Sequence, residues 1–226
     1  MKHVERTIDI LRATKEEFAR APVGDLGAIM TSSFQSQSAP LLHLVSIHWP
    51  GLPIYFIDTG FHFAQTIHYR DKLTQMLDLN LFTIQSPSDE VRRSFNEERW
   101  RFDSNGCCDA LKVEVMEAIL KSASVTCWIT GVRRDQTKAR RVMQERGEGP
   151  YGVVRVHPVA HWTGNDMALY RAKHDLPLHP LDAKGYDSIG CWPCSSPGYL
   201  RTGRWPGEEK EGCGIHRLTH RPPCQE

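Results

Sequence analysis

Short apolar runs alternate with segments of helical spacing along most of this 226-residue chain, and this alternation restricts its fold more than any other feature. The runs that we interpret as strands are 53–57, 80–84, 125–129 and 151–157, with a possible further strand at 24–29. The helical patterns cover 7–20, 39–47, 62–77, 108–120 and 166–174. Strands that alternate with helices predict an α/β fold, with a mostly parallel sheet and flanking helices. Ligands of such sheets bind beyond the carboxyl ends of the strands.

The character of the sequence changes near residue 185. Beyond it Gly, Pro, Trp, Arg and Cys dominate, and the hydrophobic periodicity fades. We therefore predict a nucleotide-binding α/β domain over 1–185 and, as part of the same domain, a functional segment over 186–226 that folds across the site.

Composition excludes several classes of protein. Hydrophobic residues make up 40% of the chain and charged residues 24%, which is typical of a globular domain. The formal net charge of +1 gives no reason to expect nucleic acid or an anionic membrane as a partner. No stretch approaches the roughly 20 apolar residues that a membrane span needs. The first residues lack the apolar core of a signal peptide, so we expect a cytoplasmic protein.

Cysteine usage gives the first functional signal. Seven cysteines in a chain without a signal peptide argue against a disulfide scaffold and favour metal or redox chemistry. Cys107-Cys108 and Cys191-Cys194 supply four thiolates, the usual complement of a structural zinc ion or a [4Fe–4S] cluster. Adjacent cysteine side chains diverge, which suits separate irons better than one central ion. The spacing favours the cluster, with zinc or buried core thiols as alternatives. We expect Cys127 to lie in the core and assign no role to Cys224.

Cys213 lies beyond these four residues, between Gly212 and Gly214. The two glycines leave its backbone unhindered, and nearby Arg, Lys and His residues favour the thiolate. A thiolate in this setting is a candidate nucleophile toward an electrophilic sulfur. The alternative is an incidental exposed cysteine.

Two kinds of segment could bind an anion. The Ser-rich loop 31–38 could hold a phosphate through backbone and hydroxyl donors, or it could be a polar loop with helix-capping serines. It lacks the Gly-Lys-Ser/Thr of a Walker A loop. Arginines cluster after the third predicted strand and again near the C-terminus, and guanidinium groups match sulfate and phosphate oxygens. These arginines are Arg133, Arg134, Arg140, Arg201 and Arg204.

Together these motifs resemble the sulfonucleotide reductases, the adenylyl-sulfate and phosphoadenylyl-sulfate reductases of assimilatory sulfate reduction. The resemblance runs from about residue 22 to residue 216. It includes the Ser-rich loop followed by 41–45, the run 56–60, Cys107-Cys108 with Lys112, and the segments 130–136 and 179–181. The most specific motifs, in this order, are Gly190-Cys191-Trp192-Pro193-Cys194, Gly203-Arg204-Trp205 and Cys213-Gly214-Ile215-His216.

This resemblance implies an adenine nucleotide α-hydrolase-like fold and a catalytic thiol on a C-terminal segment. In that family Cys213 would attack the sulfur of the bound sulfonucleotide and become S-sulfocysteine, from which a thioredoxin dithiol releases sulfite. Lys112 would lie between the cluster and the substrate sulfate. The residues implied to bind the phosphosulfate are Arg140, Arg201, Arg204 and His216. Those implied to hold the rest of the nucleotide are Ser32, Ser33, Phe34, Asp58, Thr59, Gly60 and Arg133.

The four cysteines also bear on the substrate. Family members with the cluster usually prefer adenylyl sulfate, so we expect adenosine 5′-phosphosulfate here, with the 3′-phosphorylated form as the alternative. Two positions depart from the family pattern: Leu111 replaces an Arg, and Gly212 replaces the Glu before the catalytic cysteine. We expect the cluster to exchange no electrons, because the thiols supply both electrons that sulfite formation needs.

Two other classes of protein compete with this interpretation. An ATP pyrophosphatase would share the fold, but its phosphate loop needs Gly and Asp, and 31–38 contains neither. A zinc-stabilised binding module with basic clusters would leave Cys213 and its neighbours without a role.

Overall fold

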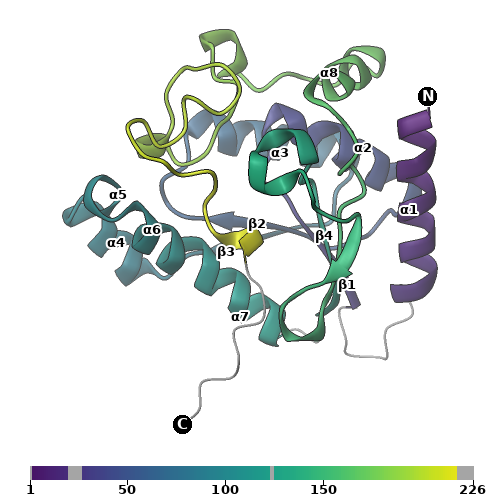
Figure 1. Cartoon of the computed structure of the whole chain (residues 1–226), viewed down its shortest axis with the longest axis horizontal. Helices are drawn as coiled ribbons and strands as arrows, with labels where there is room; N and C mark the ends of the chain where they lie inside the picture. The colour runs from purple at the N-terminus through teal and green to yellow at the C-terminus, as the bar shows by residue number, and fades with distance from the viewer. Residues whose placement is uncertain (1, 20–26, 123–124, 218–226) are drawn as a thin grey trace.

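The computed structural model describes residues 2–19, 27–122 and 125–217 of the chain. Its centre is a six-stranded sheet with the strand order β3-β2-β1-β4-β6-β5 (Figure 1). The first five strands in this order pair in parallel, and β5 pairs antiparallel with β6 at one edge. The strands are β1 Gly27–Thr31, β2 Ile54–Asp58, β3 Leu81–Gln85, β4 Val125–Thr130, β5 Arg146–Glu148 and β6 Val154–Val156.

Helices cover both faces of the sheet, which confirms the predicted α/β class. They are α1 Lys2–Phe18, α2 Ala39–His48, α3 Ala64–Leu77, α4 Ser88–Asn96, α5 Arg99–Phe102, α6 Ser104–Cys108, α7 Glu114–Ser122 and α8 Gly164–Lys173. Between α6 and α7 the five residues Asp109–Val113 form a π-helical segment, so the predicted helix at 108–120 is one part of a longer helical run over 104–122.

Two hydrophobic clusters hold these layers together. Successive side chains of a strand point to opposite faces, and β4 shows the consequence. Cys127 and Ile129 pack into the cluster that includes residues of α1, α2 and α3, whereas Trp128 packs into the cluster with α7. Cys127 is fully buried, as its position in an apolar strand predicted. Both faces of the central strands are therefore covered by apolar side chains, and this close packing makes the sheet the rigid base of the molecule.

The structure differs from the sequence-based prediction at the edge of the sheet. The strand predicted at 151–157 comprises only Val154–Val156, because a 3₁₀ turn at Pro150–Gly152 with Tyr151 at φ 59° precedes it. Its partner β5 was not predicted, since all three of its residues are exposed and carry no apolar pattern. The helices α4 and α5 were also missed, because charged residues dominate that stretch.

The strand order places a crevice at the carboxyl ends of β1 and β4. The chain proceeds from β1 to β2 and β3 on one side of the sheet and from β4 to β6 on the other. Thr31 lies beside Thr130 at the ends of these two strands, so the loops that follow them diverge around a gap. Such a switch in strand order is where open α/β sheets bind their ligands.

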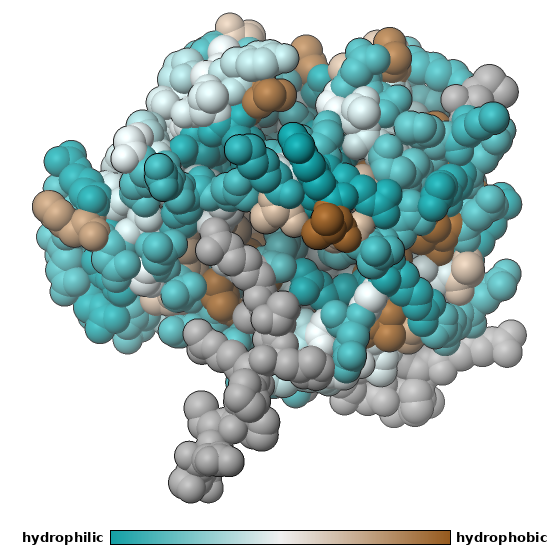
Figure 2. Space-filling model, in the orientation of Figure 1, coloured by the Kyte–Doolittle hydropathy of each residue, from teal (hydrophilic) through white to brown (hydrophobic). Residues whose placement is uncertain are grey.

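The C-terminal part of the chain crosses this edge of the sheet as irregular backbone with short 3₁₀ turns (Figure 1). An isolated bridge between His62 and Cys191 attaches it to the loop after β2. The division at residue 185 stays a prediction. In the part of the chain that the structure describes, no helix is long and apolar enough to cross a membrane. The face shown in Figure 2 is mainly hydrophilic, with hydrophobic residues scattered over it.

Candidate active site

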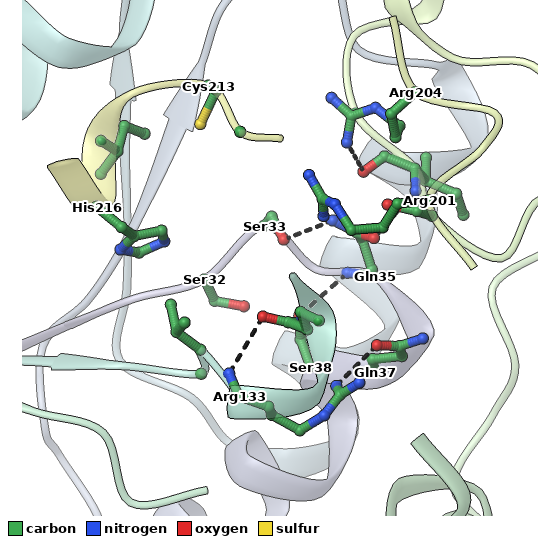
Figure 3. Close-up of a pocket in the computed structure, with 18 of the residues that line it drawn as sticks. Ser32, Ser33, Gln35, Gln37, Ser38, Arg133, Arg201, Arg204, Cys213 and His216 are labelled. Carbon is green, nitrogen blue, oxygen red and sulfur yellow. Dashed lines mark hydrogen bonds between the residues drawn. The ribbon is translucent and has the colours of Figure 1, made fainter. Parts of the chain in front are cut away.

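A cavity of about 550 Å³ lies at the carboxyl ends of β1 and β4. Its walls come from the loops after these two strands and from the C-terminal segment. Figure 3 shows Cys213 and His216 on one side, Arg201 and Arg204 on the other, and the Ser-rich loop between them. Nine residues predicted from the sequence line it together: Ser32, Ser33, Lys112, Arg133, Arg140, Arg201, Arg204, Cys213 and His216.

The Ser-rich loop owes its shape to its own hydroxyl groups. The backbone N–H of Phe34 donates to Ser32 Oγ at 3.2 Å, and Gln35 donates from its side chain to Ser33 Oγ at 3.1 Å. Phe34 has a φ of 47°, in the left-handed region, and its ring is fully buried against Phe56. The phenyl side chain therefore anchors the loop in the core and lies outside the cavity.

The run Asp58-Thr59-Gly60 does not line this cavity. Asp58 Oδ1 accepts the N–H of Gly60 at 2.9 Å, which closes a tight turn where Gly60 takes a φ of 73°. Thr59 is fully buried, with its Oγ1 3.3 Å from the sulfur of Cys191. Thr59 thus lies beside Cys191, whereas His62 and Thr66 from the following segment line the cavity.

The arginines differ in how they are held. Arg133 is buried, pairs with Asp135 at 2.9 Å and donates to Gln37 Oε1 at 2.7 Å, so its charge is compensated within the loop. Arg201 donates to the carbonyl of Glu211 at 3.0 Å. Burial, with help from nearby arginines, lowers the pKa of Arg201 to about 10, which leaves it charged at neutral pH.

Arg204 is fixed on three sides. Its Nε donates to the carbonyl of Cys194 at 3.1 Å and its Nη1 to the carbonyl of Ile189 at 3.3 Å. Its guanidinium also stacks on Trp205, 4.3 Å from the ring centroid. The charge of Arg204 is therefore held in one position beside the cavity.

Cys213 is the candidate nucleophile at the end of this basic surface. Burial opposes a charge on its thiol, but Lys112, the backbone N–H of Ile215 and Arg204 outweigh burial and hold the pKa of Cys213 below its ordinary value. A thiol with a lowered pKa is a more abundant nucleophile at neutral pH. His216 stacks on Trp128, and burial beside several cations holds its pKa well below the usual range, so its ring is neutral.

The four cysteines predicted as ligands line one small cavity next to the first. Asp103 caps α6 by accepting the N–H of Gly106 at 2.8 Å, and α6 carries Cys107 and Cys108. Burial raises the pKa of the Cys107 and Cys108 thiols, and it raises that of Cys194 to about 12. Aromatic and apolar residues complete the lining: Phe61, Trp100, Leu111, Pro193 and Trp205.

Two cations separate the cysteine cavity from the larger one. Lys112 and Arg204 line both cavities. Burial opposes the charge of Lys112, but the sulfur groups of Cys191, Cys213 and Cys108 raise its pKa above the ordinary value. Leu111, where the family pattern has an arginine, is buried in an apolar cluster with Phe61. The wall between the cavities is thus cationic, although this chain lacks one positive charge of the family pattern.

Lys210 is among the residues of this region that the sequence analysis missed. Lys210 Nζ donates to the carbonyl of Ser104 at 2.7 Å and lies 3.4 Å from the sulfur of Cys108. It comes from the run Glu-Glu-Lys-Glu at 208–211, which by itself indicates only a solvated surface. No local signal in the sequence identifies this contact.

The sequence of this chain is similar to that of known reductases. Residues 27–197 match the family model of the phosphoadenosine phosphosulfate reductase domain. The chain belongs to this family. The resemblance seen in the sequence motifs is thereby confirmed. Among its relatives, the adenosine 5′-phosphosulfate reductase of Chelativorans sp. (strain BNC1) is 41% identical over 200 residues, covering 85% of this chain and 80% of the relative. That of Geobacillus thermodenitrificans is 35% identical over 196 residues, with 83% of each chain covered.

Solved structures support the fold assignment. The phosphoadenylyl-sulfate reductase of Candida auris, in a phosphate complex, aligns with a TM-score of 0.69 at 22% identity and covers 83% of this chain and 88% of its own. The FMN adenylyltransferase of Candida glabrata aligns with a TM-score of 0.65 at 16% identity and covers 87% of this chain and 62% of its own. At these identities the likeness extends to the fold alone, a mostly parallel sheet with flanking helices.

Proposed function

We propose that this protein reduces adenosine 5′-phosphosulfate to sulfite and AMP, with Cys213 as the nucleophile. The observation that carries the proposal is the position of Cys213, a thiol with a lowered pKa in the basic cavity at the sheet's switch point. The relatives named adenosine 5′-phosphosulfate reductase support the choice of substrate. An assimilatory role in the cytoplasm, leading to cysteine, is part of the same proposal.

In the first step the Cys213 thiolate attacks the sulfur of the bound substrate. The new bond joins Sγ to this sulfur, and the bond between sulfur and the bridging oxygen breaks with its electron pair leaving on AMP. Arg140, Arg201 and Arg204 surround the position where this negative charge develops, and fixed cations there lower the barrier. The neutral ring of His216 can donate a hydrogen bond to the departing phosphate without adding a charge.

The nucleotide would lie along the loop after β1. Ser32 and Ser33 line the cavity there, and Arg133 with its partner Asp135 braces the loop after β4 on the opposite side. The assignments of Phe34, Asp58, Thr59 and Gly60 to substrate binding stay predictions. For these four, the positions described above favour an indirect role, since none of them lines the cavity.

In the second step a thioredoxin dithiol regenerates the enzyme. One of its thiolates attacks Sγ of S-sulfocysteine, sulfite leaves with the electron pair of the S–S bond, and a mixed disulfide forms. The second thiol then displaces Cys213 as a thiolate. The dithiol supplies both electrons, so Cys213 ends each cycle in the state in which it began.

The four cysteines of the smaller cavity fit a [4Fe–4S] cluster. Four buried thiols from two separate segments converge on one space. Yet within the described residues no three His, Cys, Asp or Glu side chains are arranged to hold a single metal ion. The adjacent pair Cys107-Cys108 favours a cluster with several irons over one zinc, because adjacent side chains diverge. Bound there, the cluster would supply electrostatic and structural support, while Lys112 and Arg204 separate its ligands from the substrate.

The test is sulfite release from adenosine 5′-phosphosulfate by anaerobically purified protein with thioredoxin. Cys213→Ser should retain substrate binding and the brown colour of the cluster but release no sulfite, whereas Cys127→Ser, which alters a core thiol, should remain active. Assay of the 3′-phosphorylated substrate in parallel decides the specificity. Colourless protein that acts on neither substrate would refute the proposal and favour the zinc-stabilised binding module.

A further inference from the structure

Gln35 connects the Ser-rich loop to the C-terminal segment, 154 positions further along the chain. Its Oε1 accepts the backbone N–H of Ile189 at 3.0 Å, and its Nε2 donates to Ser33 Oγ at 3.1 Å. Figure 3 shows Gln35 between Ser33 and the part of the C-terminal segment that carries Arg204. One side chain therefore contacts both the loop and the segment that line the larger cavity.

The partners of Gln35 fix the orientation of its amide group. A backbone N–H only donates, so the atom that faces Ile189 is the amide oxygen, and the NH₂ group faces Ser33. Ser33 Oγ therefore accepts a hydrogen bond from Gln35, which directs its own hydroxyl hydrogen away from this amide. Ser33 is exposed and lines the larger cavity, so this hydrogen can be donated to an oxygen atom of a bound anion.

Ile189 extends this contact to Arg204. Its N–H is bonded to Gln35, and its carbonyl accepts Arg204 Nη1 at 3.3 Å. The next residue, Gly190, leaves no space beside the guanidinium, since a Cβ there would lie 2.5 Å from Arg204 Cζ. Arg204 also donates to the carbonyl of Cys194 at 3.1 Å. A shift of the backbone at 189–190 must therefore move the guanidinium, and Gln35 holds that backbone.

A second glutamine of the loop contacts the same segment at a longer distance. Gln37 Oε1 accepts Arg133 Nη1 at 2.7 Å, and its Nε2 lies 3.5 Å from the carbonyl oxygen of Asp187. The contact with Asp187 is at the limit of hydrogen-bond geometry, whereas the 3.0 Å bond from Ile189 to Gln35 has an ordinary length. Of the two glutamines, Gln35 is therefore the stronger link to the residues that precede Arg204.

We propose that Gln35 is a positioning residue for the release of AMP from the sulfonucleotide; this rests on the function proposed above. By donating to Ser33, it leaves the Ser33 hydroxyl hydrogen for the phosphate of the nucleotide. Through Ile189, it keeps the Arg204 guanidinium where negative charge develops on the departing AMP. Gln35 thus sets the spacing between a neutral donor of the loop and a cation of the C-terminal segment, and donors fixed in advance stabilise developing charge most effectively.

Gln35→Met removes both hydrogen bonds at little cost in volume. Methionine is unbranched and similar in length to glutamine, but its thioether has no N–H to donate and is only a weak acceptor. Gln35 is half-buried, so the variant should fold, which its melting temperature checks. Gln75→Met is the matched control, because Gln75 is exposed on α3 and lines neither the larger cavity nor the cysteine cavity.

The experiment measures AMP affinity by calorimetry and AMP release from adenosine 5′-phosphosulfate in a single turnover. Both are measured for wild type, Gln35→Met, Ser33→Ala, the double variant and Gln75→Met. Gln35→Met should weaken AMP binding about tenfold, the effect of one hydrogen bond to a charged group. In the Ser33→Ala background this effect should be at least about threefold smaller, because Gln35 acts partly through Ser33. Release should be about tenfold slower with Gln35→Met in either background, since Arg204 loses support. Gln75→Met should change neither quantity.

An equal loss of AMP affinity in the two backgrounds would overturn positioning through Ser33 and indicate that Gln35 contacts the nucleotide directly. AMP release at the wild-type rate in Gln35→Met would overturn the link through Ile189 to Arg204. If the methionine variant does not fold, Gln35→Ala takes its place in the same set of measurements. Wild-type protein that binds AMP but releases none from adenosine 5′-phosphosulfate would refute the proposed function itself. The affinities would still test the role of Ser33, which separates the two failures.

Discussion

Replacement of Gly190 by alanine should disable the protein through Arg204. A Cβ at this position would lie 2.5 Å from Arg204 Cζ and 2.8 Å from Nη1, and nearer still to Nη2. Ordinary contacts of carbon are about 3.5 Å, so the guanidinium must move by about 1 Å or more. It cannot do so freely, because it is bonded to the carbonyls of Cys194 and Ile189 and stacked on Trp205.

Both stability and rate should fall. Loss of two hydrogen bonds from a buried charged group costs about 2–4 kcal/mol, which for a chain of this size lowers the melting temperature by about 5–15 °C. If Arg204 stabilises the departing phosphate, its displacement removes one preorganised donor and should slow single-turnover AMP release by about 10²-fold.

The assay compares Gly190→Ala with Gly147→Ala, a substitution for which the structure leaves space around the added methyl group. Melting temperature and single-turnover AMP release are measured for both. Release within about twofold of the Gly147→Ala control, an effect too small for one lost charged donor, would refute the reasoning that Arg204 is fixed and that its position matters for the reaction.

Two further predictions concern the attachment of the C-terminal segment and the response to acid. Lys210→Met removes the hydrogen bonds to Ser104 and the contact with Cys108, so amide hydrogen exchange in 206–214 should become about tenfold faster. Lys184→Met, which alters an exposed side chain, is the control. Equal exchange rates in the two variants would contradict the prediction. Burial lowers the pKa of His179 to about 4, and its Nδ1 accepts the N–H of Leu181 while Nε2 donates to Thr66, so the folded state requires the neutral ring. Because the folded pKa lies below the ordinary value of about 6.5, stability is complete above pH 6.5 and declines as the pH falls toward 4, by about 2 kcal/mol at pH 5. Thermal unfolding at pH 7.5 and pH 5 should show a smaller loss in His179→Gln than in wild type, and an identical loss would contradict it.

Charge placement joins the two cavities into one site. Lys112 and Arg204 line both the cysteine cavity and the larger cavity that contains Cys213. A group bound to the four cysteines would therefore influence the substrate through these two cations. Leu111 adds no charge to this wall, so the electrostatic connection rests on them.

The sequence by itself determined the class of fold, the family and the types of residue at the site. Alternating apolar and helical patterns are local properties, so most strands of the sheet and most helices could be predicted from neighbouring residues. The paired cysteines and the glycine-flanked Cys213 were visible for the same reason, since each motif is contained in a few consecutive positions.

Only the tertiary structure decided which side chains meet. Phe34 points into the core because the left-handed turn reverses it, and Thr59 reaches Cys191 because the loop after β2 bridges to the C-terminal segment. Lys210 contacts Cys108 across more than 100 residues of sequence. Such contacts depend on strand order and on how irregular segments pack over the sheet, and these are set by long-range burial that leaves no pattern in adjacent residues.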